Sequence, residues 1–477
     1  MVQNIIAEKL GSEIAKNLEN GLDYYLPSKG EVLSGEKLTV SYPIALASLN
    51  WYRKKDPRTA LGIAFIGSYL LGRVSFTGTN ALHLLEYDVR DNLTQLVHQI
   101  LVINPKVLGL GVYCWNDKQT KQLLQDLRAI GYNGTIVVGG PQISYGDERL
   151  KEEYPEADYF VKGDGEEAFY KIVEGMTLGQ RVDLPGIFTQ ESLLFDRVAQ
   201  VEDLDSIPSP YQEEKIQEKL LGKKFIRWQT QRGCYFKCSF CAFTNPQATS
   251  RSISAEKTEQ DLLFFKIHGV KEVAVLDPIF FVHKKRAIEI LDLIEKYVPE
   301  TRFEIQTRLE HLNEEIIQKV EKLNIVLECG IQTLNREIQK VISRYNVKNK
   351  VLENLRLVQN HKIPLEAHLI YGLPLQTMDS LLDDIDTIMN FRPSKMRIFP
   401  LILLKGTPMY EQCETIYKEK MKFGPSYPQY VLETEWMDMK TIYALSYMQE
   451  ILDEEVEKEK PMKAREMFAL AKKKIEE

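Results

Sequence analysis

Short apolar runs alternate with longer amphipathic runs through the first third of the chain. The run VLGLGVYC at 107–114 is apolar throughout, as in a strand that is buried on both faces. Residues 118–130 place apolar side chains at helical spacing and end at Gly131, which is typical of a helix terminus. The same periodicities predict strands at 37–42, 83–89, 135–138 and 159–162, and helices at 59–72, 93–103 and 166–175. Strands that alternate with helices predict a doubly wound parallel sheet, which binds ligands at the carboxyl ends of its strands.

A second alternating block begins near residue 225. Its predicted strands cover 225–229, 272–276, 302–306, 325–327, 366–370 and 395–400, and long helices separate most of them. Six such units predict a partial (β/α)6 barrel, short of the closed eight-unit form. The pattern becomes irregular after Thr407 and is helical from Met439 onward.

These patterns divide the chain into five segments. Residues 1–36 are interpreted as a helix at 5–18 and a linker with proline and glycine. The first sheet occupies 37–190, a linker with the run LDSIPSPY covers 191–224, the barrel covers 225–410, and a helical C-terminal region covers 411–477. The predicted fold class is therefore α/β, with an N-terminal doubly wound, Rossmann-like parallel sheet before the partial barrel and the helical region.

The composition narrows the class of protein without indicating a ligand. The 477 residues are 44% hydrophobic and 27% charged, as in ordinary globular proteins. The formal net charge of −7 is small for this length and argues against a polyanion-binding surface, so no nucleic acid is expected. The longest strongly apolar stretch, 61–72, is too short for a bilayer, and the charged N-terminus lacks the apolar run of a signal peptide. We therefore expect a cytoplasmic protein that does not bind membranes.

Half of the six cysteines lie in one short segment. Cys234, Cys238 and Cys241 follow the first predicted barrel strand, so they lie on a loop at a carboxyl end. Six cysteines are too few for a disulfide scaffold, and a structural zinc site needs four ligands, whereas this loop has no histidine and no fourth cysteine. Iron–sulfur clusters accept cysteine ligands, and three cysteines leave one iron of a four-iron cluster open for chemistry. Three unrelated core cysteines are the remaining alternative.

The spacing of these cysteines after a first barrel strand resembles the radical S-adenosylmethionine (radical SAM) superfamily, in which an aromatic residue such as Phe240 precedes the third cysteine. The segments ECGIQT at 328–333 and HLIYGLP at 368–374 are similar to two further segments of that superfamily. The resemblance covers about residues 225–410. It implies that the three cysteines hold a [4Fe-4S] cluster whose open iron chelates SAM, and that Phe240, Gln332, Tyr371 and Gly372 belong to the cofactor site.

Four residues at predicted strand ends are candidates for contacts with SAM. The superfamily often ends its second strand in Gly-Gly-Glu, where this chain has Asp277, which could bind the methionine amine or only cap the strand. Gln306 and Arg308 could reach the ribose or carboxylate of SAM, although Arg308 could instead pair with a surface acid. Glu328 lies at the barrel mouth, where a carboxylate readily accepts hydrogen bonds from ribose hydroxyls or an amine. Its neighbour Cys329 should face the opposite side of the strand.

The first block lacks the GxGxxG turn of a nicotinamide site, because Gly109 and Gly111 lie within a predicted strand. It resembles instead the cobalamin-binding domain that precedes the barrel in one branch of radical SAM enzymes. The matching segments are TALGIAFIGSYL at 59–70, GLGVYCWN at 109–116, VGGP at 138–141 and KGDGE at 162–166. The resemblance implies a cobalamin site that contains Tyr113, Trp115, Asn116, Gly139, Gly140, Pro141, Gly163 and Glu166. The alternative is that the glycines only form turns and that Trp115 only packs.

The predicted loop at 43–56 contains no histidine, so the cobalt should lack a protein imidazole. Asn50, Trp51 or Arg53 could lie near its lower face. His83 and His98 lie elsewhere, on a predicted strand and helix.

The fusion of these two blocks resembles cobalamin-dependent radical SAM methyltransferases. The resemblance implies that a 5′-deoxyadenosyl radical takes hydrogen from an unactivated carbon of a peptide or small-molecule biosynthetic intermediate, and that methylcobalamin delivers the methyl group. The same fusion also supports rearrangement, cyclisation or polar methyl transfer, and a non-catalytic cobalamin or cluster sensor is a distant alternative. An electron donor such as flavodoxin or ferredoxin would reduce the cluster. The region after Gly406, with Tyr410, Tyr427, Tyr430 and Trp436, would close the cleft between the two domains.

Overall fold

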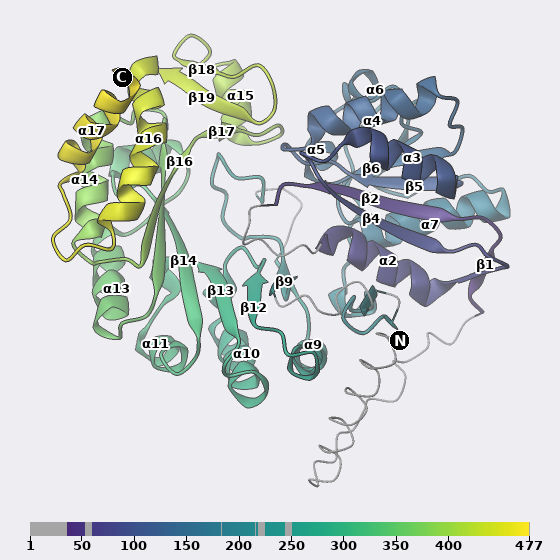
Figure 1. Cartoon of the computed structure of the whole chain (residues 1–477), viewed down its shortest axis with the longest axis horizontal. Helices are drawn as coiled ribbons and strands as arrows, with labels where there is room; N and C mark the ends of the chain where they lie inside the picture. Colours follow the sequence, from purple (N-terminus) through teal and green to yellow (C-terminus); the bar gives the residue numbers. More distant parts are fainter. Residues whose placement is uncertain are drawn as a thin grey trace, which may run out of the picture.

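The computed structural model describes residues 36–52, 60–182, 184–214, 216–217, 225–243 and 250–476. The helix expected at 5–18 and Arg53 lie outside the described residues. Two six-stranded sheets dominate the structure and lie next to each other along its long axis (Figure 1).

The N-terminal sheet has the strand order β4-β2-β5-β6-β7-β8. Its strands are β2 (Ile44–Asn50), β4 (Leu82–Asp88), β5 (Val107–Gly111), β6 (Thr135–Gly139), β7 (Tyr159–Val161) and β8 (Ile187–Thr189). All neighbours pair in parallel except β8, which is antiparallel to β7. Helices α2 (Leu61–Arg73) and α7 (Gly165–Leu178) cover one face, and α3 (Leu93–Ile103) and α4 (Asp117–Ala129) cover the other (Figure 1).

The structure differs from the sequence-based expectations at three places in this sheet. The predicted loop at 43–56 contains β2, whose run IALASLN is buried at every position because it lies inside the sheet. The segment predicted as the first strand forms only β1 (Leu38–Val40), which pairs with β3 (Val74–Phe76) in a separate ribbon. The strand predicted at 159–162 forms β7, and β8, for which no strand was predicted, adds an edge strand after it.

The order of the parallel strands creates a crevice at one point of the sheet. Strand β2 lies between β4 and β5. The chain passes from β2 to β4 at one edge of the sheet and then returns to β5 on the other side of β2, from which it continues toward the opposite edge. Open α/β sheets bind ligands outside the carboxyl ends of the strands at this switch point.

The second sheet is parallel throughout and has the order β16-β15-β14-β13-β12-β9. Its strands are β9 (Phe225–Trp228), β12 (Glu272–Val275), β13 (Arg302–Thr307), β14 (Ile325–Gln332), β15 (Leu365–Tyr371) and β16 (Lys395–Pro400). Its helices are α9 (Ala255–Ile267), α10 (Lys284–Tyr297), α11 (Glu314–Val320), α12 (Arg336–Val341), α13 (Lys348–Asn360) and α14 (Met378–Met389). The predicted partial barrel is confirmed.

The C-terminal region, predicted as helical over 411–477 with an irregular start, contains strands as well as helices. Strands β17 (Ile402–Leu403), β18 (Met421–Phe423) and β19 (Gln429–Thr434) form an antiparallel sheet, and α15 (Pro408–Glu414) lies between β17 and β18. Strands β17 and β18 have only two and three residues, which leave little alternation from which to predict them. Helices α16 (Met439–Glu455) and α17 (Ala464–Glu476) follow, as expected from the pattern after Met439.

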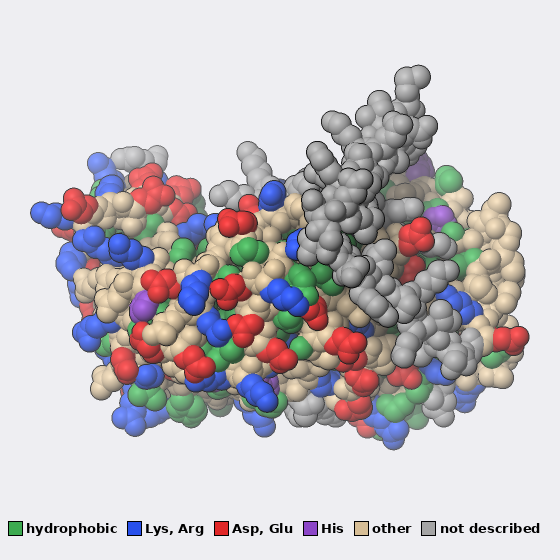
Figure 2. Space-filling view, turned by 90° about the horizontal axis from the view of Figure 1, so that it is seen from below, with side chains coloured by type: hydrophobic (Ala, Val, Ile, Leu, Met, Phe, Trp, Pro, Cys, Tyr) green, Lys and Arg blue, Asp and Glu red, His purple; other side chains and the backbone are tan. Residues whose placement is uncertain are grey.

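Acidic and basic side chains are interspersed over the face of the molecule that is seen from below (Figure 2). Pairs of opposite sign link neighbouring barrel helices, as between Lys296 of α10 and Glu259 of α9 at 3.0 Å. Among the described helices, none combines the length and the apolar character needed to traverse a lipid bilayer.

Candidate functional site

The three clustered cysteines line one cavity of about 210 Å³ at the carboxyl end of the barrel strands. Cys238 is buried, whereas Cys234 and Cys241 are partly exposed. Backbone hydrogen bonds fix the loop from two directions: Ser239 donates to the carbonyl of Ile342 at 2.9 Å and accepts from the amide of Met409 at 2.9 Å. The loop therefore has a defined conformation around its thiols.

Burial raises the pKa of the Cys234 thiol and raises that of Cys241 to about 11, and the neighbouring thiols add to both effects. The thiols thus lie close enough to sense one another's charge. Metal ligation requires thiolates, so a metal centre here would displace their protons.

Asp277 does not line this cavity. Its carboxylate accepts hydrogen bonds from the backbone amides of Thr230 (2.7 Å) and Gln231 (2.9 Å) and from the Thr230 hydroxyl. It is fully buried, and burial raises its pKa. Of the two roles considered for Asp277, the geometry supports the structural one, since the carboxylate holds the segment that leads into the cysteine loop.

Arg308 lines the cavity and is 5% exposed. Its guanidinium lies 4.1 Å from the ring centroid of Phe236 and donates to Glu310 (3.1 Å) and to Asn346 (2.8 Å). Burial and the charge of Arg344 lower its pKa. The sequence left open that Arg308 pairs with an acid at the surface. Arg308 does pair with an acid, Glu310, but this pair lies at the wall of the cavity.

Sequence analysis did not predict Arg344, which lines the same cavity. Its Nη1 lies 3.5 Å from Sγ of Cys238, and its Nη2 donates to the carbonyl of Gly330. Arg344 lies 106 residues from Cys238 in a segment without periodic pattern, so only the folded chain brings the two together.

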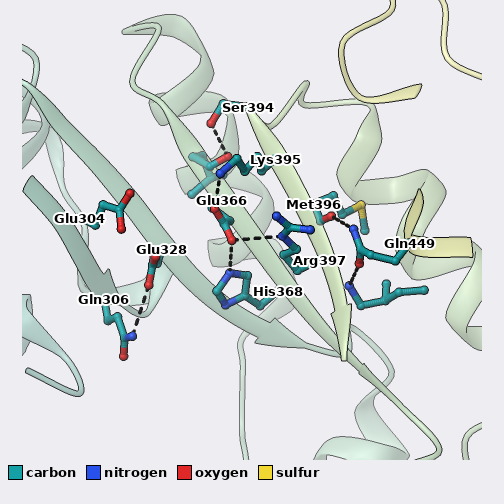
Figure 3. A network of polar contacts seen from close by, with 12 residues as sticks. Glu304, Gln306, Glu328, Glu366, His368, Ser394, Lys395, Met396, Arg397 and Gln449 are labelled. Atoms are coloured by element: carbon teal, nitrogen blue, oxygen red, sulfur yellow. Dashed lines mark hydrogen bonds and ion pairs between the residues drawn. The ribbon is translucent and has the colours of Figure 1, made fainter. Parts of the chain in front are cut away.

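A row of polar side chains crosses four adjacent barrel strands (Figure 3). Gln306 of β13, Glu328 of β14, Glu366 of β15 and Lys395 of β16 occupy successive register positions. Gln306 donates to Glu328 at 3.2 Å. Burial and the Glu366 and Glu304 carboxylates raise the pKa of Glu328. As expected, Cys329 faces away from this row into the apolar core.

Glu366 has the opposite electrostatic environment. Burial acts to raise its pKa, but the hydrogen bond with His368 at 3.1 Å and the cations of Lys395 and Arg397 lower the value to about 2 (Figure 3). Glu366 is therefore an anion held within an ion-pair network, whereas its neighbour Glu328 is more readily protonated. Gln306, Glu328 and His368 all line the cysteine cavity.

Four other candidates from the sequence differ in their placement. Phe240 and Gln332 line the cysteine cavity. Tyr371 is buried and Gly372 packs against Val431 of β19, and neither lines the cavity. The segment GLP thus joins the barrel to the C-terminal sheet in this structure.

A second and larger cavity, of about 640 Å³, opens at the switch point of the N-terminal sheet. Its lining includes the strand-end residues predicted there, namely Asn50, Trp51, Tyr113, Trp115, Gly139, Gly140, Pro141, Gly163 and Glu166. The described residues that line it include no histidine. His83 and His98 line a separate surface depression.

Glycine leaves room along one wall of this cavity. A β-carbon at Gly139 would lie no closer than 3.6 Å to Val161, so the backbone itself does not require glycine there. The missing side chain opens space in the cavity instead. Tyr113 and Trp115 stack at 4.4 Å between ring centroids and form a flat aromatic part of the wall.

Asn116, which was expected to line the cobalamin site, instead forms hydrogen bonds with the backbone. It is fully buried, donates to the carbonyls of Leu49 (2.8 Å) and Gly111 (3.0 Å), and accepts from the amide of Tyr113 at 2.8 Å. Asn116 does not line the cavity; it ties the ends of β2 and β5 together.

Glu166 connects the two halves of the molecule. Its Oε1 lies 2.5 Å from Nη2 of Arg232, which precedes the cysteine loop by two residues in β10 (Gln231–Arg232). Its Oε2 is buried at the cavity and has no hydrogen-bond partner in the structure. Asp164 pairs with the same arginine at 3.4 Å and with Arg251 of β11 (Arg251–Ser252) at 2.6 Å.

The two cavities share part of their lining. Gln306 and Phe243 belong to both, so the cysteine-lined cavity and the glycine-lined cavity adjoin at these two side chains. Arg227, Gln229, Arg232 and Leu276 contribute further barrel residues to the larger cavity.

Comparison with known proteins identifies both halves. Residues 60–173 match the B12 binding domain, and residues 228–388 match the radical SAM superfamily. The chain belongs to the cobalamin-dependent radical SAM enzymes. Its cofactors are a [4Fe-4S] cluster, SAM and cobalamin.

Several relatives combine the same two domains. The chain is 25% identical over 381 residues to the cobalamin-dependent radical SAM methyltransferase TokK of Streptomyces tokunonensis, and the match covers 71% of this chain and 54% of TokK. The chain therefore spans about half the length of this curated relative. The solved structure of the methyltransferase TsrM from Kitasatospora setae shares the fold at a TM-score of 0.67 with 15% identity, covering 83% of this chain and 80% of TsrM. The cobalamin-dependent SAM radical enzyme OxsB shares it at 0.66 with 15% identity, covering 92% and 71%.

The residues of this radical SAM enzyme fit both metal cofactors. Three thiols and two buried arginines with unpartnered Nε atoms surround the smaller cavity, which suits an anionic iron–sulfur cluster. Aromatic rings, glycine and the unpartnered Glu166 Oε2 line the larger cavity, which suits a broad ligand with polar amide groups.

Proposed function

We propose that this protein is a cobalamin-dependent radical SAM methyltransferase that methylates an unactivated carbon of a peptide or small-molecule biosynthetic intermediate. The observation that carries the proposal is that the two cavities adjoin, since Gln306 and Phe243 line both of them. A substrate bound at this junction would lie next to both cofactor sites. The names of TokK and TsrM as methyltransferases favour methyl transfer over rearrangement or cyclisation.

When bound, the cluster and SAM supply a carbon-centred radical that abstracts hydrogen, and cobalamin supplies the methyl group. Cys234, Cys238 and Cys241 hold the cluster in this proposal. Gln306 donates to Glu328 and would hold that carboxylate in place to accept from hydroxyl or amine groups of SAM. Phe243 and the Tyr113–Trp115 stack present apolar surface to the larger cavity, which would help to exclude water from the reaction. Phe240, Gln332 and Arg308 line the SAM side, and Gly139, Gly140, Pro141 and Gly163 line the cobalamin side.

We further propose that a small electron-transfer protein such as flavodoxin or ferredoxin reduces the cluster. We place the reaction in the cytoplasm, because three thiolate iron ligands need a reducing environment.

The full chain, reconstituted anaerobically with iron, sulfide and cobalamin and reduced with titanium(III) citrate, tests the proposal. Incubation with SAM should yield 5′-deoxyadenosine and S-adenosylhomocysteine, measured by mass spectrometry. Cys238→Ala should abolish 5′-deoxyadenosine formation and bound iron but retain cobalamin, whereas Cys413→Ala, a buried cysteine of α15, should retain all three.

Absence of both products from the reconstituted wild-type protein would contradict the methyltransferase proposal. Loss of cobalamin together with iron in Cys238→Ala would contradict two separate cofactor sites.

A further inference from the structure

Arg344 is a buried cation beside one of the proposed iron ligands. It is 8% exposed and lies between α12 and α13. Its Nη1 is 3.5 Å from Sγ of Cys238, and its Nη2 donates to the carbonyl of Gly330. Its Nε is buried without a hydrogen-bond partner.

The surroundings of Arg344 contain little negative charge of their own. Among the described residues, no carboxylate forms an ion pair with Arg344. The nearby acid Glu310 pairs with Arg308 instead, at 3.1 Å. Both arginines line the cavity, and Arg308 also has an unpartnered Nε. Burying a guanidinium without a counter-charge is unfavourable. The negative charge that balances it must therefore come from what binds in the cavity.

A cluster held by three thiolates supplies that charge. Each thiolate is an anion, and the reduction of the cluster by one electron makes the centre more negative still. Nearby positive charge and N–H donors to ligand sulfur stabilise the reduced form more than the oxidised form. Arg344 provides both at Cys238.

We propose that Arg344 sets the reduction potential of the cluster by donating a hydrogen bond to the sulfur of Cys238 and by offsetting the charge of the added electron. In this step one electron passes from an external reductant to the cluster, and no bond to Arg344 forms or breaks. The role requires the cluster but not methyl transfer, so its test needs no substrate.

The experiment is a potentiometric titration of the reconstituted full chain without SAM, followed by the electron paramagnetic resonance signal of the reduced cluster. Arg344→Gln should lower the ratio of reduced to oxidised cluster at least tenfold at a given potential, which equals a midpoint lower by about 59 mV for one electron. Arg344→Lys keeps the charge but not the planar donor group, and should shift the midpoint in the same direction by less. The matched control is Arg336→Gln, which removes the same charge from an exposed position at the start of α12 and should leave the midpoint unchanged.

The other possible outcomes also decide for or against this role of Arg344. A wild-type midpoint in Arg344→Gln with full iron content would overturn it and leave Arg344 as a structural link to Gly330. A shift that appears only after SAM is added would also overturn it, because Arg344 would then serve the SAM carboxylate. If Arg344→Gln binds no iron, Arg344→Lys decides: a lower midpoint supports the proposal, and a wild-type midpoint or loss of iron overturns it. If the midpoints change as expected but the wild-type protein forms no 5′-deoxyadenosine from SAM, the proposed function is contradicted and the role of Arg344 is not.

Discussion

The Nη2 atom of Arg232 lies 2.5 Å from Oε1 of Glu166 and joins the cysteine loop to the cobalamin-binding domain. Both side chains are largely buried, at 14% and 4% exposure. Arg232 also lies 5.2 Å above the ring centroid of Phe65 in α2 and donates to Asp164 in a second ion pair. The position of the cysteine loop therefore depends on the neighbouring domain.

Removing one partner of this pair should destabilise the protein strongly. Arg232→Gln leaves the Glu166 carboxylate buried and short of its counter-charge, which typically costs about 3–5 kcal/mol in free energy of unfolding. Urea unfolding followed by tryptophan fluorescence measures this cost. Arg149→Gln, which breaks the exposed pair with Asp147, is the matched control and should cost at most about 1 kcal/mol. Equal costs for the two variants would contradict a stabilising role of the Arg232–Glu166 pair.

Filling the space at Gly139 should displace cobalamin and spare the cluster. The backbone there tolerates a β-carbon, whose nearest neighbour would be Val161 at 3.6 Å, but the branched side chain of Gly139→Val occupies the cavity. We expect at least a tenfold loss of cobalamin affinity, measured by absorbance after gel filtration, with normal iron content. Gly424→Val, whose nearest neighbour would be at 3.9 Å and which lies outside both cavities, should bind both cofactors normally. Unchanged cobalamin binding in Gly139→Val would place the corrin elsewhere.

Asp384 should make stability fall as pH rises. Its carboxylate accepts hydrogen bonds from Thr333 Oγ1 (2.7 Å) and the amide of Leu334 (3.0 Å), just beyond β14, and burial raises its pKa to about 6. Because this folded-state pKa exceeds the ordinary value of 3.8, the folded protein binds the proton more tightly, and stability is lost between about pH 4 and pH 6. The loss is at most about 3 kcal/mol. Asp384→Asn should therefore gain melting temperature relative to wild type as the pH rises from 4.5 to 7.5.

The control for that comparison is Asp379→Asn, which changes an exposed carboxylate on the same helix. Its melting temperature should keep a constant difference from wild type across the same pH range. If the melting temperature of Asp384→Asn also differs from that of wild type by the same amount at every pH, burial of the Asp384 carboxylate does not affect stability between pH 4.5 and 7.5.

Gly406 should be required for the contact between the C-terminal part and the N-terminal domain. It has φ +66°, and a β-carbon there would lie 2.6 Å from the carbonyl oxygen of Tyr145. Gly406→Ala should therefore both strain the backbone and push the two domains apart, and limited proteolysis should cleave the variant faster near residue 406. Gly78→Ala has a similar φ of +63° but no neighbour within 4 Å, so it isolates the cost of the backbone alone. Equal proteolysis of the two variants would contradict the contact.

Periodicity predicted the two sheets because their apolar strands and amphipathic helices repeat locally along the chain. It failed at β2. The segment 37–42 was predicted as the first strand of the sheet, so the buried run at 44–50 was interpreted as part of a loop. The cysteine spacing predicted the loop that lines the smaller cavity, since its thiols are close in sequence. Arg344 could not be predicted in this way, because its contact with Cys238 spans 106 residues. Asp277 and Asn116 are polar residues at strand ends, and the sequence alone does not show what they bind. In the folded chain Asp277 accepts hydrogen bonds from backbone amides, and Asn116 donates to backbone carbonyls.

The amide of Met409 closes the cysteine loop by donating to Ser239, and the adjoining Lys405 pairs with Glu153 of α6 (Leu150–Glu153). Met409 is translated 170 residues after Ser239. A nascent chain that has emerged only as far as the last barrel strand therefore exposes its cysteines without this closing hydrogen bond. The conformation of the cysteine loop in the finished protein thus depends on a part of the chain that is synthesised after the whole barrel.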